Sequence, residues 1–326
     1  MNRKLERAKI LVTGGAGFIG SNLIEVLLAK GCEVICLDNF LTGKRENLAS
    51  FLDNPAFRLI EGDIRDPATC RKAVENMDYV LHEAALGSVP RSIADPVTTT
   101  EINITGFVNM LFASVEAKVK RFVYAASSST YGDSRELPKI EDRIGKPLSP
   151  YAITKYANEL FAENFSSIYG IETVGLRYFN VFGKRQDPFG MYAAVIPKFA
   201  MSLIRHEPPR INGSFSRDFT YIDNVVQANL LALLAQSGES LNTVYNVAYG
   251  EETTLTQLFE FLREDLSAFD PEIRKVHAIH GPERRGDIPH SLADISKARR
   301  LLGYAPEIDV REGLRRTARW YFDNLR

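Results

Sequence analysis

The chain has 326 residues, of which 40 are basic and 41 acidic, so its formal net charge is −1. Hydrophobic residues make up 45% and charged residues 25%, the proportions of an ordinary globular protein. This balance excludes a general positive field for nucleic acid or an anionic membrane surface, and we expect neither as a partner. No apolar run approaches the roughly 18 residues of a membrane helix. Glycines interrupt the first apolar stretch, residues 10–12, so we expect no signal peptide and a cytoplasmic location.

Cysteine and histidine are sparse. An odd count of three cysteines does not make a disulfide framework, which favours a reducing compartment. Cys32 and Cys36 could be a redox or metal pair, but they lie in an apolar run typical of a buried strand, and we interpret them as core residues. His277 and His280 have no acid or cysteine cluster at suitable spacing, so we expect no metal site.

Short β-branched runs alternate with segments of helical spacing through the first half of the chain. We predict strands at residues 10–13, 33–38, 57–61, 79–82, 121–125, 173–178 and, further on, 245–248. We predict helices at residues 21–30, 67–76, 100–117 and 151–169, with Gly31 and Gly170 placed as C-terminal caps. This alternation predicts the doubly wound, or Rossmann, α/β fold, in which helices cover both faces of a parallel sheet.

The rhythm changes from about Phe182, where prolines begin to separate shorter elements. We place the first domain at residues 1–181. The remainder, 182–326, is expected to form a smaller mixed α/β lobe that is interwoven with the first domain.

A glycine-rich turn follows the first predicted strand and opens the first helix. Gly14 permits a tight turn, Gly17 lets the backbone approach a pyrophosphate, and Gly20 allows close helix–sheet packing. The second strand ends in Asp38, where a carboxylate can accept both hydroxyls of an adenosine ribose and would repel a 2′-phosphate. The pattern favours NAD over NADP, although Arg45 nearby keeps the choice open.

Two further strand ends belong to the same edge of the predicted sheet. Asp63 and Ile64 follow the third strand, and Ala84 and Ala85 follow the fourth. Ligands of doubly wound proteins lie across the carboxyl ends of the strands, and small residues there leave room for a dinucleotide.

Tyr151 and Lys155 stand four residues apart at the start of a predicted helix, so both project from one helical face. A nearby lysine cation, together with an oxidised nicotinamide ring, would favour the phenolate form of the tyrosine and make it a general base. The pair alone is a weak signal. About twenty residues upstream, however, the serine-rich segment 125–132 follows a strand that ends at the same edge.

These motifs resemble the extended short-chain dehydrogenase/reductase family, and specifically its nucleotide-sugar 4-epimerases. The matching segments are TGGAGFIG at 13–20, SSSTYG at 127–132, SPYAITK at 149–155, LRYFNV at 176–181, RDF at 217–219 and RRGD at 284–287. They extend over nearly the whole chain.

The resemblance implies a role for each matching residue. Ser127 corresponds to the catalytic serine, with Ser128 able to share its work, Tyr151 to the base and Lys155 to its partner. The NAD contacts it implies are Gly14, Gly17, Phe18, Ile19, Gly20, Asp38, Asn39, Thr42, Gly43, Asp63, Ile64, Ala84, Ala85, Asn103, Tyr151, Lys155 and Tyr178. The substrate contacts it implies are Gly87, Ser88, Ser127, Ser128, Tyr151, Asn180, Arg217, Arg284 and Ser291.

The resemblance also narrows the reaction. Related 4,6-dehydratases carry an Asp-Glu pair directly after the catalytic hydroxyl residue, where this chain has Ser128 and Ser129. We therefore expect a UDP-sugar 4-epimerase that oxidises the sugar transiently at C4. Galactose-type members carry a tyrosine at the position of Ser291, and a serine leaves room for a 2-acetamido group, which favours UDP-GlcNAc and UDP-GalNAc; UDP-Glc and UDP-Gal are also considered.

Three other functions stay open: a UDP-glucuronate-type 4-epimerase, an NAD(P)-dependent nucleotide-ketosugar reductase, and, more remotely, a non-catalytic NAD-binding scaffold. An apolar stripe on the predicted helices 100–117 and 151–169 is either core or a subunit interface; it comprises Ile102, Val108, Leu111, Phe112, Leu160 and Phe161. Family members commonly dimerise through these helices, so we expect a homodimer.

Overall fold

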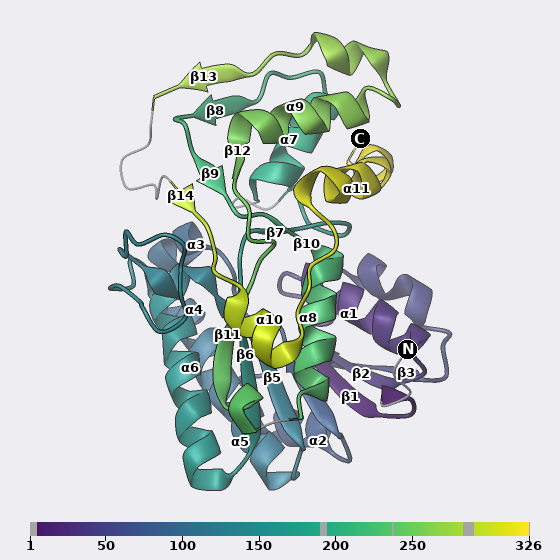
Figure 1. The fold of residues 1–326 in the computed structure, drawn as a ribbon. Helices are drawn as coiled ribbons and strands as arrows, with labels where there is room; N and C mark the ends of the chain where they lie inside the picture. Colours follow the sequence, from purple (N-terminus) through teal and green to yellow (C-terminus); the bar gives the residue numbers. More distant parts are fainter. Residues whose placement is uncertain (1–4, 190–193, 237, 283–289, 326) are drawn as a thin grey trace.

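The computed structural model describes residues 5–189, 194–236, 238–282 and 290–325 (Figure 1). In these ranges the main sheet has seven parallel strands in the order β11-β6-β5-β4-β1-β2-β3. They are β1 (Lys9–Thr13), β2 (Glu33–Asp38), β3 (Phe57–Glu61), β4 (Tyr79–His82), β5 (Arg121–Ser127), β6 (Glu172–Tyr178) and β11 (Thr243–Val247). The predicted doubly wound fold is confirmed.

Helices cover both faces of this sheet. One face is covered by α1 (Phe18–Ala29) and α8 (Ile222–Leu234), and the other by α2 (Pro67–Val74), α5 (Phe107–Glu116) and α6 (Pro150–Tyr169). The remaining helices near this layer are the short α3 (Val89–Ala94), α4 (Pro96–Thr100) and α10 (Ser296–Leu302).

Strand side chains alternate between two apolar cores, as the period of a strand requires. On β1, Ile10 and Val12 join the core under α1 and α8, whereas Leu11 joins the core under α2, α5 and α6. On β2, Cys36 belongs to the first core and Leu37 to the second. Burial raises the pKa of the Cys36 thiol, so it is an inert core residue, as the sequence indicated.

The smaller lobe stacks at one end of the sheet (Figure 1). Its elements are β7 (Val181–Phe182), α7 (Val195–Ile204), β8 (Arg210–Asn212), β9 (Ser216–Arg217), β10 (Thr220–Tyr221), β12 (Thr253–Thr254), α9 (Leu255–Leu266), β13 (Ile279–Gly281), β14 (His290–Ser291) and α11 (Val310–Asn324). Both α8 and β11 come from beyond residue 182, yet they belong to the main sheet layer. The two parts of the chain are therefore interleaved.

Helix starts differ most from the sequence prediction. The first helix begins at Phe18 rather than at residue 21, because Gly17 is already its N-cap. The segment predicted at 100–117 is helical from Pro96, with Asp95 capping the first turn and a π-helical turn at Glu101–Gly106. These starts follow from local capping, which hydrophobic periodicity does not report. No helix in the described ranges is long and apolar enough to cross a membrane.

A buried ion pair clamps α6 onto the sheet. Arg177 of β6 donates two hydrogen bonds to the carboxylate of Glu159 on α6, at 2.9 and 2.7 Å, and a third to the carbonyl of Glu141 at 2.8 Å. The side chains of Arg177 and Glu159 are 3% and 7% exposed. Each of the three guanidinium nitrogens thus donates a hydrogen bond, and the Glu159 carboxylate accepts two of them, so both buried charges are compensated.

Removing one partner of this pair should destabilise the protein strongly. Arg177→Met leaves the Glu159 carboxylate buried without its cation, so we expect a loss of about 3 kcal/mol in the free energy of unfolding. Urea denaturation followed by circular dichroism measures it. Arg315→Met, which breaks an exposed pair with Glu312, should cost less than about 1 kcal/mol. Equal losses in the two variants would contradict this account.

Candidate active site

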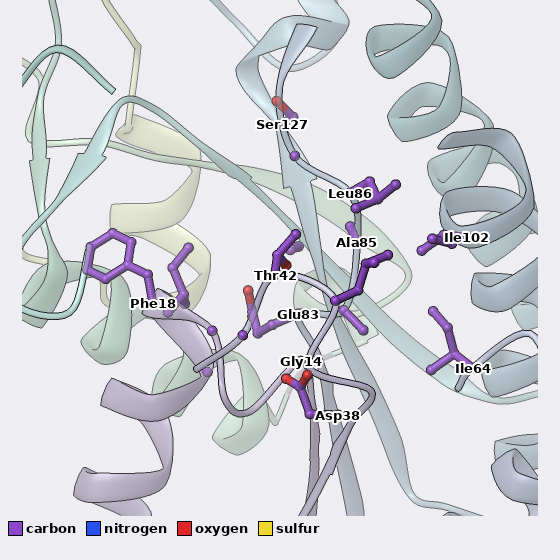
Figure 2. A pocket seen from close by; sticks show the side chains of 18 of the residues that line it. Gly14, Phe18, Asp38, Thr42, Ile64, Glu83, Ala85, Leu86, Ile102 and Ser127 are labelled. Carbon is purple, nitrogen blue, oxygen red and sulfur yellow. The ribbon is translucent and has the colours of Figure 1, made fainter. Parts of the chain in front are cut away.

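One pocket of about 390 Å³ opens along the carboxyl ends of the strands. Figure 2 shows it between the glycine turn, the end of β2, the segment after β4 and the end of β5. Of the residues expected to bind cofactor or substrate, those that line it are Gly14, Gly17, Phe18, Ile19, Gly20, Asp38, Asn39, Thr42, Gly43, Ile64, Ala84, Ala85, Gly87, Ser127, Tyr151, Lys155, Tyr178 and Asn180. The strand ends thus converge as a doubly wound sheet requires.

The glycine turn is shaped for close approach. Gly14 has a φ of +65°, and a Cβ there would lie 2.7 Å from the backbone nitrogen of Ala84. A Cβ on Gly20 would collide with the carbonyl of Gly14. Gly17 caps α1 without a side-chain hydrogen bond, so in the described structure the first N–H groups of this helix are available to an anion.

Asp38 is held at the same end of the pocket as the glycine turn. Its carboxylate accepts the backbone N–H groups of Ala16 at 2.9 Å and Phe40 at 2.8 Å. Burial raises the pKa of Asp38, and these two hydrogen bonds lower it. The side chain is therefore oriented beside the glycine turn, where an adenosine ribose would meet it.

A second hollow continues from the first beyond Gly17 and Phe18, and its polar lining includes Lys44, Arg91 and Arg185. Arg185 binds Glu25 through Nη2 at 2.6 Å, while its buried Nη1 has no hydrogen-bond partner within the described chain. The close-packed glycine turn and the basic residues that line this hollow suit the phosphates of a dinucleotide.

Ser127, Tyr151 and Lys155 line the same pocket, from the end of β5 and the start of α6. Ser149 caps α6 and Pro150 is its first residue, which fixes where the helix begins. The Lys155 Nζ donates to the carbonyl of Ala125 at 2.7 Å and lies 6.0 Å from the centre of the Tyr151 ring.

The protein environment sets the proton affinities of these groups. Burial raises the pKa of Tyr151, a hydrogen bond with Ser127 lowers it, and the charge of Glu83 raises it. Burial lowers the pKa of Lys155 to about 8. The Ser127 Oγ also accepts hydrogen bonds from the backbone N–H and the hydroxyl of Ser129, at 3.1 and 2.9 Å, so it is oriented toward the pocket by its own loop.

Sequence reasoning missed one ionisable residue of the pocket, Glu83. It directly follows β4 and projects among the lining residues in Figure 2. Burial raises its pKa to about 7. Its position one residue before Ala84 and Ala85 was the available signal, because the residue after a strand end faces the same edge.

Two expected cofactor contacts do not line the pocket. Asn103 lies behind its wall, where its side chain bonds both the N–H and the carbonyl of Leu86 and the hydroxyl of Thr154. Asp63 accepts a hydrogen bond from Asn39 at 2.9 Å and pairs with Arg65, which lowers its pKa to about 2. Both residues position their neighbours, Leu86 and Asn39, which do line the pocket.

The smaller lobe brings two expected substrate contacts together. Ser291 on β14 pairs in register with Arg217 on β9. The buried carboxylate of Asp218 accepts three backbone N–H groups, from Tyr249, Gly250 and Ala293, and so fixes these strands against the next loop. Asp218 is the middle residue of the RDF motif, and its organising role was not assigned from the sequence.

Of the other expected substrate contacts, Asn180 lines the main pocket and Ser88 the second hollow. Asn180 donates to the carbonyl of Asp218 at 3.0 Å and so joins the two lobes. Ser88 lines the second hollow with a φ of 102°, unusual for a residue with a side chain. Ser128 follows Ser127 in a short 3₁₀ helix and does not line the main pocket. Arg284 lies outside the described residues.

Comparisons with known proteins agree with this geometry. A model of the NAD dependent epimerase/dehydratase family matches residues 10–248. The UDP-N-acetylglucosamine 4-epimerase of Methanobrevibacter ruminantium, solved with UDP-N-acetylmuramic acid, is 37% identical with a TM-score of 0.90, covering 98% of this chain and 99% of that one. A UDP-glucose 4-epimerase of Thermus thermophilus, solved with NAD, is 33% identical with a TM-score of 0.83, covering 96% and 98%.

A UDP-glucuronate 4-epimerase of Arabidopsis thaliana is 32% identical over 335 aligned residues, which cover 96% of this chain and 75% of the relative. The family match includes the glycine turn, the serine segment and the start of α6. The chain therefore belongs to the NAD-dependent epimerase/dehydratase family, and NAD is its cofactor.

Proposed function

We propose that this protein is an NAD-dependent 4-epimerase of UDP-N-acetylhexosamines that interconverts UDP-GlcNAc and UDP-GalNAc. The observation that carries the proposal is the meeting of Ser127, Tyr151 and Lys155 in one pocket, with Ser128 and Ser129 where dehydratases carry acids. Without an acid after Ser127, elimination of a sugar hydroxyl lacks its proton donor at that position.

Each residue has a distinct task in this proposal. Tyr151 takes the proton from the sugar 4-hydroxyl, and Ser127, which is hydrogen-bonded to Tyr151 in the protein, bonds the same sugar oxygen. The Lys155 ammonium favours the phenolate form of Tyr151 electrostatically. NAD supplies the hydride acceptor and donor at C4. The 4-ketosugar rotates in the pocket between the two half-reactions, so that its other face meets the cofactor. The nucleotide diphosphate must therefore be bound by residues outside the sugar site.

In this proposal, residues of the smaller lobe bind the nucleotide diphosphate. Arg217 and Arg284 are the candidate diphosphate ligands, because guanidinium groups match phosphate oxygens. Ser291, in register with Arg217, supports the choice of sugar, since a small side chain beside the diphosphate leaves room for a 2-acetamido group. The likeness to a UDP-N-acetylglucosamine 4-epimerase supports the same choice.

Two other reactions on the same fold are distinguished by one assay. The protein is incubated separately with UDP-GlcNAc, UDP-Glc and UDP-GlcA, and the 4-epimers are resolved while NADH is followed. We expect UDP-GalNAc to form fastest, with no net change in NADH. With NAD⁺ added, stoichiometric formation of NADH would show net oxidation of the sugar and assign a ketosugar reductase running in reverse, and exclusive conversion of UDP-GlcA would assign a uronate epimerase.

The phenol of Tyr151 should be indispensable. Tyr151→Phe removes the general base without altering the ring, so we expect kcat to fall by roughly 10²–10⁴-fold. Bound NAD, measured after denaturation, should stay at the wild-type level. Tyr156→Phe, on the same helix, is the matched control and should keep wild-type turnover. Full activity of Tyr151→Phe would favour the non-catalytic scaffold instead.

The side chain at position 291 should control the preference for acetylated sugars. Ser291→Tyr fills the space proposed for the acetamido group, so we expect kcat/KM for UDP-GlcNAc to fall roughly 10- to 200-fold relative to UDP-Glc. Ser291→Ala, which adds no bulk, should keep the wild-type ratio. An unchanged ratio in Ser291→Tyr would place the acetamido group elsewhere.

We also propose a homodimer formed through α5 and α6. Of the stripe predicted from the sequence, Ile102 and Leu111 are core residues, whereas Phe112 and Leu160 are 42% and 49% exposed. Further along α6, Ile168 is also exposed. An apolar surface on two adjacent helices of a folded domain marks an interaction site.

Light scattering at micromolar concentration tests this interface. We expect the mass of two chains for the wild type and of one chain for Leu160→Lys, because a buried ammonium would break the contact. Ile279→Lys, an equally exposed apolar position in the smaller lobe, should leave the dimer intact. A monomeric wild type would refute the proposal.

A further inference from the structure

Glu83 carries a carboxylate into the pocket that the roles described so far do not use. It follows β4 directly, and its Oε1 accepts a hydrogen bond from the Tyr178 hydroxyl at 2.8 Å. The Tyr178 hydroxyl in turn accepts a hydrogen bond from Asn229 Nδ2 at 2.9 Å. This chain of hydrogen bonds fixes the orientation of the carboxylate, so its charge acts from a defined position.

Lys155 is the cation beside Glu83: its Nζ donates to the carbonyl of Ala125, and the register of β4 and β5 places Ala125 next to Glu83. Two carboxylates act on the Lys155 ammonium, those of Glu83 and Glu159. Glu159 is already bound by two hydrogen bonds to Arg177, which neutralises most of its charge. Glu83 is bonded to the neutral hydroxyl of Tyr178 and is attracted by Lys155. The available negative charge near the ammonium is therefore that of Glu83.

The other titratable groups near this pair are accounted for. His82, on β4, stays neutral, because burial and the charge of Lys155 lower its pKa to about 3. Tyr178, on β6, stays protonated and donates to Glu83, since burial raises its pKa. Tyr151, on α6, faces both groups: Glu83 disfavours its phenolate form, so the ammonium has to offset that effect.

We propose that Glu83 is a positioning residue whose carboxylate is the counter-charge that keeps Lys155 in its ammonium form beside Tyr151. The benefit for catalysis rests on the proposed epimerase function, because it assumes that the ammonium supports a phenolate base. The attraction between the two charges does not depend on which substrate the pocket binds.

The direction of the expected change in the Lys155 pKa follows from the charges of Lys155 and Glu83. Burial moves the pKa of Lys155 down to about 8 and that of Glu83 up to about 7, and their mutual attraction opposes both shifts. Near neutral pH and up to about 8, the ionised carboxylate therefore helps Lys155 to keep its proton. Without the carboxylate, the ammonium is lost at lower pH, and the alkaline limit of activity moves toward neutrality.

The test removes the charge of Glu83 and reads the proton on Lys155 directly. Glu83→Gln keeps the size of the side chain and an oxygen that can accept from Tyr178. The Lys155 Cε resonance is followed against pH by NMR with isotope-labelled lysine and assigned with Lys155→Met, in protein as purified with matched NAD content. We expect the midpoint to fall by roughly one pH unit. Glu61→Gln, an exposed glutamate at the end of β3, should not move it.

Tyr178→Phe provides a second variant if Glu83→Gln folds poorly. It removes the hydroxyl that stabilises the ionised carboxylate, so the Lys155 midpoint should fall in the same direction by a smaller amount. The alkaline limb of the kcat profile should move with the midpoint. An unchanged Lys155 midpoint in Glu83→Gln would overturn the proposal, even if activity were lost.

The two proposals fail separately. If Tyr151→Phe retained full activity, the proposed function would fall while the shift of the Lys155 midpoint would stand. If the midpoint did not move while UDP-GalNAc was still formed, Glu83 would lose its assigned role and the epimerase proposal would survive.

Discussion

The buried pair of Arg177 and Glu159 joins the two elements between which the candidate active site is built. Glu159 lies one turn beyond Lys155 on α6, and Arg177 directly precedes Tyr178 on β6. Because an unpaired charge buried this deeply is strongly destabilising, this contact favours the position of the helix in which the two groups pair. With the helix in this position, Tyr151 and Lys155 of α6 line the same pocket as Tyr178 of β6.

The other buried charged groups of the pocket also have hydrogen-bond partners. Asp38 is satisfied by backbone N–H groups, Asp218 by the loops that it joins, and Glu83 by a tyrosine hydroxyl. Lys155 has a carbonyl as its hydrogen-bond acceptor, so its charge depends on carboxylates nearby. The pocket therefore has two polar ends, one beside the glycine turn and one around Tyr151. A bound dinucleotide with a reactive ring needs polar groups at both ends.

The sequence predicted the parts of the fold that short-range patterns govern. The strands at 33–38, 57–61 and 79–82 were located to the residue, because each is a β-branched run bounded by turn residues. Helix starts were placed less well, since Gly17 and Asp95 act through caps rather than through periodicity.

The site could be predicted where a motif joins residues that are close in sequence, as in the glycine turn and the Tyr151–Lys155 pair. It could not be predicted where side chains meet only in three dimensions. Asn103 was expected to touch the cofactor, yet the π-helical turn directs it at Leu86. Glu83 had no motif of its own, and its role emerges only from its contact with Tyr178, 95 positions further along the chain.

The central claim is that one pocket removes hydrogen from a sugar C4 and returns the same hydrogen to the opposite face. UDP-GlcNAc deuterated at C4 tests it most directly, with the position of the label in UDP-GalNAc read by NMR. The account predicts complete retention of deuterium at C4 during conversion in ordinary water, because the hydride stays with the bound cofactor. Loss of the label to solvent, or its appearance in free NADH, would contradict the account.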